Sequence, residues 1–177
     1  MRREDLLDLN DVLQHPGRRL AVDISTELAE EEDIDLIQPL EGFIEAVSTG
    51  NLLLIVGEFK TKAIFECSRC TGPVELDIAF EVDEQFPVDG TPSSMNPQDV
   101  AKVAPDEPYE MFDGNSLMVE QLLRQAFHLS VPLQPLCPFG WDGGCPQAAE
   151  RAEVAQMAIE DHPLDKLAKF LHEDLKD

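Results

Sequence analysis

The stretch VELDIAFEVD, residues 74–83, places an apolar side chain at every second position, with acidic residues or alanine between them. Because successive side chains of a β-strand point to opposite faces, this period of two predicts a strand with one buried face. The segments GFIEAV (42–47) and NLLLIVGEF (51–59) flank the turn signal STGN and predict a hairpin. With RRLAVDIST (18–26) as a further strand, we expect an α+β fold built on an antiparallel sheet over residues 18–86.

Helical spacing of apolar residues appears in the second half of the chain. We expect a helix over residues 116–129, capped by Ser116 or Asn115 and ended by the proline that follows. Its expected apolar face consists of Leu117, Val119, Leu122, Leu123 and Phe127. Residues 148–160 have good helix propensity, and residues 162–175 carry a leucine stripe that should dock on another surface. We expect helices of the C-terminal half to pack on the sheet.

The length of the chain favours one domain. Its 177 residues suffice for a sizeable core, and a hydrophobic content of 43% is that of a folded protein, so we treat residues 1–177 as a single domain. Residues 87–110 are rich in proline and polar residues and have no sustained periodicity, which predicts a flexible excursion within it. Residues 5–14 have leucines at roughly helical spacing and predict a short helix or turn.

Charge limits what the chain can bind. It has 36 acidic and 13 basic residues, which give a formal net charge of −23. Such a chain repels phosphate backbones, so a direct electrostatic grip on nucleic acid is not expected. The first residues carry charges where a signal peptide needs apolar side chains, and the longest aliphatic run, residues 52–56, is too short to cross a bilayer. We expect a cytoplasmic protein with no membrane partner, in a compartment that disfavours structural disulfides.

Four cysteines stand in two pairs. Cys67 and Cys70 form a CxxC motif between two predicted strands, so we expect this motif to lie in a turn. Cys137 and Cys145 lie in a later segment rich in proline and glycine. Two cysteine pairs held in tight turns suit a tetrahedral zinc site, which needs four thiolates. The first hypothesis is therefore one structural zinc ion with these four cysteines as ligands.

The same cysteines admit two other interpretations. Seven residues separate the second pair, where a regular zinc knuckle has about two to four, and His128 or His162 are conceivable substitute ligands. A redox CxxC is the second hypothesis, although a nucleophilic cysteine works best at a helix N-terminus near positive charge, and only Arg69 lies nearby. Inert thiols are the third.

No other arrangement of residues predicts catalysis. The chain contains no GxGxxG, GxxxxGK[ST], HExxH or GxSxG motif, and its carboxylates stand in strings typical of solvated surfaces. We expect a protein without enzymatic activity and predict no catalytic residues.

The order of these segments resembles the YceD family, whose members are known as large ribosomal RNA subunit accumulation proteins. The resemblance rests on CSRC after a strand, the alternating strand, a proline-rich excursion, the segment VPLQPLC and the closing HPLDKLAKFL, and it covers the chain from about residue 18 to the end. Many members have a denser second cysteine cluster than CPFGWDGGC and others lack it, so the family does not imply zinc in every member.

The resemblance implies a noncatalytic factor in the accumulation or processing of large-subunit ribosomal RNA. Because a chain of net charge −23 should not grip bare RNA, we expect it to act through a basic partner, a ribosomal protein or assembly factor, with RNA contact indirect. Phe139 and Trp141 are the expected anchors for that partner, and packing beside the cysteines is their alternative role. Two other functions stay open: a zinc-stabilised interaction module unrelated to ribosomes, and a thiol oxidoreductase that uses the CxxC.

Overall fold

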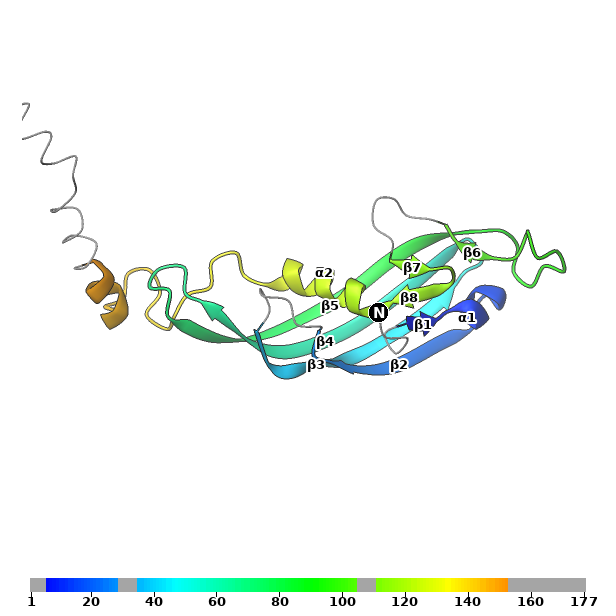
Figure 1. Cartoon of the computed structure of the whole chain (residues 1–177). Helices are drawn as coiled ribbons and strands as arrows, with labels where there is room; N and C mark the ends of the chain where they lie inside the picture. Colours follow the sequence, from blue (N-terminus) through cyan, green and yellow to red (C-terminus); the bar gives the residue numbers. More distant parts are fainter. Residues whose placement is uncertain (1–5, 29–34, 105–110, 153–177) are drawn as a thin grey trace, which may run out of the picture. The chain divides into compact units, whose positions relative to one another are not determined.

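The computed structural model describes residues 6–28, 35–104 and 111–152. The elements in chain order are β1 (Leu6–Asp8), α1 (Asn10–Gln14), β2 (Arg19–Thr26), β3 (Asp35–Ser48), β4 (Leu52–Glu66), β5 (Pro73–Asp89), β6 (Lys102–Val103), β7 (Phe112–Asp113), β8 (Ser116–Met118) and α2 (Val119–Ser130). They form a five-stranded sheet in the order β2-β3-β4-β5-β6 and a three-stranded sheet in the order β1-β8-β7 (Figure 1). Antiparallel sheets with a few helices confirm the predicted α+β class.

Contacts divide the chain into two compact units. The first unit consists of Met1–Ile64 and Glu75–Pro132, and it contains most of both sheets and α2. The second unit consists of Phe65–Val74 and Leu133–Asp177, and it contains all four cysteines.

Long strands build the sheet of the first unit. β2 pairs antiparallel with β3 along its whole length, and β3 pairs antiparallel with β4. The predicted hairpin is present: the Thr49 N–H donates to the Leu52 carbonyl at 2.8 Å, and Gly50 adopts a φ of +100°, which glycine tolerates in a turn. The predicted alternation in β5 is also present, since Val74, Ile78 and Val82 are buried and the acidic residues between them are exposed.

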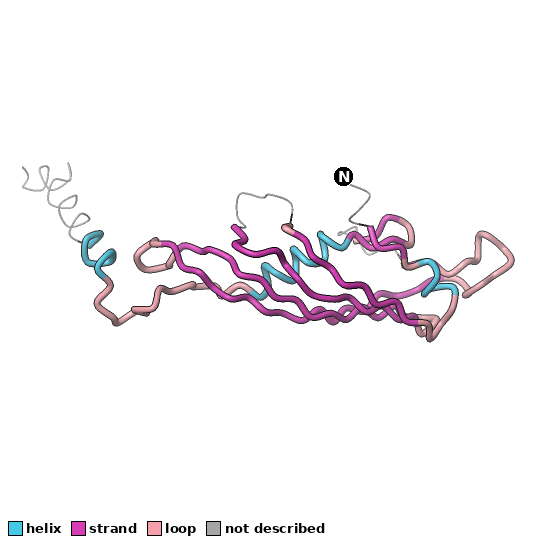
Figure 2. The backbone as a smooth tube through the Cα atoms, turned by 90° about the horizontal axis from the view of Figure 1, so that it is seen from below, coloured by secondary structure: helices cyan, strands magenta, loops and turns pink. Residues whose placement is uncertain are grey.

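The helix α2 covers one face of this sheet (Figure 2). Its buried residues are Val119, Leu122, Leu123 and Phe127. The Phe127 ring meets Phe80 edge-on at a centroid distance of 6.5 Å, and Phe80 stacks on Phe59 at 5.7 Å. Part of the core of the first unit therefore lies between α2 and the even-numbered residues of β5. None of the helices within the described ranges is long and apolar enough to cross a membrane.

The helix cap predicted at Ser116 or Asn115 is wrong. Residues 116–118 form β8, which pairs with β1 so that Leu117 lies opposite Leu7, and α2 begins at Val119 without a side-chain cap. Pairing with β1 satisfies the backbone of residues 116–118 and buries Leu117 completely, and this tertiary contact outweighs the local signal for a helix start. The leucine pattern of residues 5–14 is split in the same way between β1 and α1.

The ends of the expected excursion over residues 87–110 join the sheet. β5 continues to Asp89, and β6 pairs with it, placing Val103 opposite Val88. Ala101 is fully buried. Residues 105–110 lie outside the described residues, as does the expected closing helix at 162–175, whereas residues 146–152 are helical.

Candidate metal centre

The first two cysteines lie in the connection between β4 and β5. Cys67 directly follows β4, residues 68–70 are in turn conformation, and β5 begins at Pro73. The connection is closed by the Cys67 N–H, which donates to the Gly72 carbonyl at 2.9 Å, and by the Thr71 N–H, which donates to the Cys67 carbonyl at 2.8 Å. These bonds bend the chain tightly enough to bring the thiols of Cys67 and Cys70 together.

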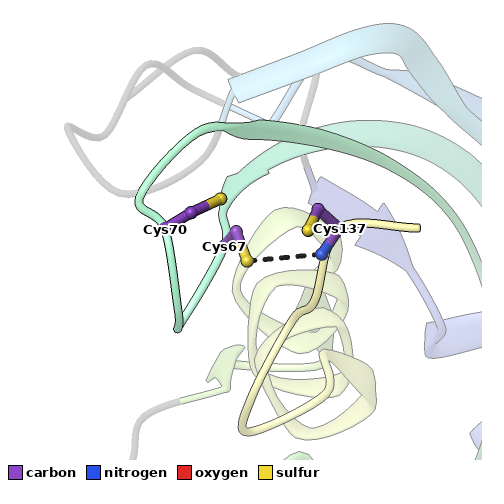
Figure 3. Close-up of side chains that lie close together, drawn as sticks. All are labelled: Cys67, Cys70 and Cys137. Atoms are coloured by element: carbon purple, nitrogen blue, oxygen red, sulfur yellow. Dashed lines mark hydrogen bonds between the residues drawn. The ribbon is translucent and has the colours of Figure 1, made fainter. Parts of the chain in front are cut away.

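The later segment is tied to this connection by backbone hydrogen bonds. The Ser68 N–H donates to the Pro135 carbonyl at 2.8 Å, and the Cys137 N–H donates to the Sγ of Cys67 at 3.3 Å (Figure 3). As a result, the Sγ atoms of Cys67, Cys70 and Cys137 all lie within 4.8 Å of one another.

Cys145 joins this cluster despite its distance in sequence. It is 4% exposed, and its thiol interacts with the thiols of Cys70 and Cys137. The intervening loop folds back through two turns, in which the Gly140 N–H donates to the Cys137 carbonyl and the Gly143 N–H to the Phe139 carbonyl, both at 2.9 Å. Gly140 has a φ of +57°, and a side chain on Gly143 would overlap the Phe139 carbonyl, so both turns depend on glycine.

Burial and mutual hydrogen bonding separate the pKa values of these thiols. Hydrogen bonds from the backbone of Cys70, Arg69 and Cys137 and from the Cys70 thiol lower the pKa of Cys67 to about 6, against the effect of desolvation. Hydrogen bonds from the backbone of Ala148 likewise lower the pKa of Cys145. The backbone of Gly72 lowers the pKa of Cys70, but desolvation and the neighbouring thiols raise it further, to about 11. The cluster thus favours the thiolate form of Cys67 and Cys145 and the protonated form of Cys70.

The donor set fits a zinc ion. In a tetrahedral tetrathiolate site the bonds of about 2.3 Å place neighbouring sulfurs about 3.8 Å apart, and the first three sulfurs lie within 4.8 Å of one another. Zinc prefers thiolates, and the backbone N–H groups aimed at Cys67 supply the second layer of hydrogen bonds that such ligands need. Among the described residues no histidine joins this cluster, and His128 lies instead on α2 beside Phe127. His162 is outside the described residues.

Arg69 has a structural role that the sequence did not reveal. A single guanidinium nitrogen, Nη1, donates to the carbonyls of Gly140 at 2.9 Å and Gly143 at 2.7 Å. The residue between the first two cysteines thereby holds the loop between the second two. Its acceptors are backbone carbonyls, which leave no signal in a sequence, and only the glycines around them hinted at an unusual turn.

The loop held by Arg69 presents the two aromatic residues that the sequence singled out. Phe139 is 49% exposed and Trp141 is 52% exposed. Half of each side chain is therefore accessible, while the backbone beneath them is fixed by the turns and by Arg69.

Comparison with known proteins gave one match. The model of a family described as "Large ribosomal RNA subunit accumulation protein YceD" matches residues 55–171, a span that includes both cysteine pairs. No curated protein and no solved structure matches the chain.

Proposed function

This chain belongs to the YceD family, and from that premise we propose that it is a noncatalytic factor that promotes the accumulation or processing of large-subunit ribosomal RNA during ribosome biogenesis. The observation that carries the proposal is the family match, which extends over residues 55–171. The cysteine cluster supports a structural role for this region, because the Cys70 thiol interacts with the other three thiols and three of the four cysteines are buried.

A basic protein is the partner that the charge of the chain favours. With a net charge of −23, the chain is attracted to ribosomal proteins or assembly factors that themselves bind RNA, and it is repelled by RNA. Phe139 and Trp141 supply accessible aromatic surface for such a contact, since exposed aromatic side chains on a fixed backbone are common anchors at interfaces. By covering the basic surface of its partner, the protein would keep that partner from binding RNA prematurely.

One structural zinc ion, held by Cys67, Cys70, Cys137 and Cys145, completes the proposal. Zinc bound by four thiolates stabilises a fold and has no open position for a substrate. Such an ion would fix the CxxC connection to the aromatic loop. The hydrogen bonds of Arg69 already link these two segments.

The lowered pKa of Cys67 also suits a redox thiol, but its burial favours the role of a metal ligand. Reactive cysteines combine a low pKa with access to a substrate. Cys67 is completely buried and accepts a hydrogen bond from the Cys137 N–H. Loss of bound zinc in Cys67→Ser, with zinc retained in the neighbouring Ser68→Ala, would support the metal site. Catalysis of disulfide exchange by the metal-free wild type would instead support the oxidoreductase.

Sedimentation tests the proposed function. A tagged chain in a gentle lysate is run through a sucrose gradient at low and raised salt, and fractions are probed for large-subunit precursors. Co-migration with these precursors that is lost at raised salt is the expected result, because the contact is electrostatic. If the chain stays at the top of the gradient at both salts and no free ribosomal protein co-purifies with it, the ribosomal role is wrong and an unrelated zinc-stabilised interaction module is the better account.

A further inference from the structure

The face of the five-stranded sheet opposite α2, which we call the outer face, carries exposed apolar side chains. Phe43 is 38% exposed and Val56 is 40% exposed. In the strand register Phe43 lies between Asp23 of β2 and Glu58 of β4, so an aromatic ring is flanked by a carboxylate on either side. Directly opposed residues of neighbouring antiparallel strands point to the same face, which places these three side chains in one row.

A hollow of about 820 Å³ crosses the sheet at this row. It is formed by three-residue segments of four adjacent strands, namely residues 23–25, 41–43, 58–60 and 79–81. In β4 and β5 the middle residues of these segments are Phe59 and Phe80, which stack on each other on the α2 side. Their neighbours in each strand therefore point to the outer face. Those outer-face residues are Asp23, Ser25, Glu41, Phe43, Glu58, Lys60, Ala79 and Glu81.

The carboxylates of this outer hollow have no partners among the residues that the structure describes. In the part of the chain that the structure describes, Asp23, Glu41, Glu58 and Glu81 form no ion pair and no side-chain hydrogen bond, and neither does Lys60, which is the only cation among the residues that line the hollow.

Two ion pairs lie elsewhere on the same strands. Arg19 pairs with Glu45 at 3.1 Å, and Lys62 pairs with Glu75 at 2.9 Å. Around Phe43, by contrast, four carboxylates share a single cation, Lys60, which lies opposite Glu41 in the strand register.

We propose that the outer hollow binds arginine side chains of an extended basic segment of a partner protein. A guanidinium group can stack on the ring of Phe43 while it donates hydrogen bonds to the carboxylates of Asp23 and Glu58 on either side. An ammonium group of lysine is a point charge and matches this planar arrangement less well. The inference rests on the proposed function, because it gives the basic partner of that proposal a contact surface and a recognised side chain.

Peptide binding tests the inference on the full-length purified chain. The probe is a fluorescent peptide of four Arg-Ala repeats, read by anisotropy, with citrulline in place of arginine as the uncharged control. We expect the double variant Asp23→Asn/Glu58→Gln to lose about tenfold in affinity, since two charge-assisted contacts are removed. The matched control Asp77→Asn/Asp83→Asn changes the net charge equally at exposed positions of β5 outside the hollow, and it should stay within about twofold of the wild type.

The aromatic part of the site has its own readout. A peptide with lysine in place of arginine should bind the wild type several-fold more weakly, and Phe43→Ala should abolish this preference. Equal losses in both double variants would show that net charge alone attracts the peptide and would overturn the inference, as would binding of the citrulline peptide or no binding of the arginine peptide.

The gradient experiment separates this inference from the proposed function. If the wild type co-migrates with large-subunit precursors and Asp23→Asn/Glu58→Gln co-migrates equally well, the outer hollow is not the contact although the ribosomal role stands. If the arginine peptide binds as expected but the wild type never associates with precursors or ribosomal proteins, the surface recognises basic segments of another class of protein.

Discussion

Removal of the Arg69 side chain should release the aromatic loop without removing a metal ligand. In Arg69→Ala, the carbonyls of Gly140 and Gly143 lose the donor that reaches them at 2.9 and 2.7 Å. A hydrogen bond from a charged group contributes about 1.5–3 kcal/mol, and the half-buried position of Arg69 favours the lower part of that range. We therefore expect the free energy of loop opening to fall by about 2–4 kcal/mol, which is a change of about 30- to 1,000-fold in the opening equilibrium.

Amide hydrogen exchange and fluorescence measure this opening. The N–H groups of Gly140 and Gly143 are protected by the turns of the loop, so their exchange should accelerate by the same factor in Arg69→Ala. Trp141 is the only tryptophan of the chain and is about half-exposed, so collisional quenching should rise at the same time. Zinc content should be unchanged, because every thiol remains.

Two further variants complete the test of Arg69. Arg151→Ala removes an exposed arginine from the same unit and should leave exchange and quenching as in the wild type. Arg69→Lys keeps the charge but presents a different donor geometry, and it should restore part of the protection. Unchanged protection of Gly140 and Gly143 in Arg69→Ala would refute the reasoning, because it would mean that the turns alone hold the loop.

Three other predictions address the core, the sheet and the thiols. Phe127→Ala should lower the free energy of unfolding by about 3–5 kcal/mol in urea titrations, because this side chain is 1% exposed, whereas Leu129→Ala, at 81% exposure, should change it by less than about 0.5 kcal/mol. Gly42→Ala should lower the free energy of unfolding by about 1–3 kcal/mol or more, because the added methyl group would overlap the backbone of the neighbouring strand β4. Gly144→Ala, with no atom within 4 Å of the new carbon, should leave it nearly unchanged. In the metal-free chain the thiolate of Cys67 should form as the pH rises through about 6. This ionisation appears as a step in ultraviolet absorbance, and Cys67→Ser should remove that step. A first step near the ordinary cysteine pKa would contradict the hydrogen-bonded cluster.

The sheet could be predicted because its signals are local. The alternation from Val74 to Val82 and the STGN turn each specify a strand or hairpin within a few residues. The start of α2 could not be predicted, because Ser116 is drawn into β8 by pairing with β1, more than a hundred positions earlier. Strand pairing prevails over a local cap signal when the pairing buries a side chain such as Leu117.

The four cysteines could be identified as candidate ligands from the sequence, but the way the chain brings them together could not be predicted. The CxxC pair has the spacing of a metal knuckle, whereas the seven residues between Cys137 and Cys145 argued against a second one. The structure closes this gap with backbone turns at Gly140 and with the donor from Arg69, neither of which follows from residue types alone. The outer hollow is a further case, because Asp23, Phe43 and Glu58 meet only through the register of three strands.

The separation of the two cysteine pairs along the chain makes a shared ion a reversible cross-link. Cys137 lies 70 positions after Cys67, and the segment between them includes β5, β6 and α2. Closing a loop of this length removes conformational freedom from the unfolded chain equivalent to about 4 kcal/mol in the loop-entropy model. A chelator would therefore lower the free energy of unfolding of the part of the chain that holds Phe127, because the unfolded chain would regain conformational entropy. The contacts that α2 makes in the folded state would stay the same.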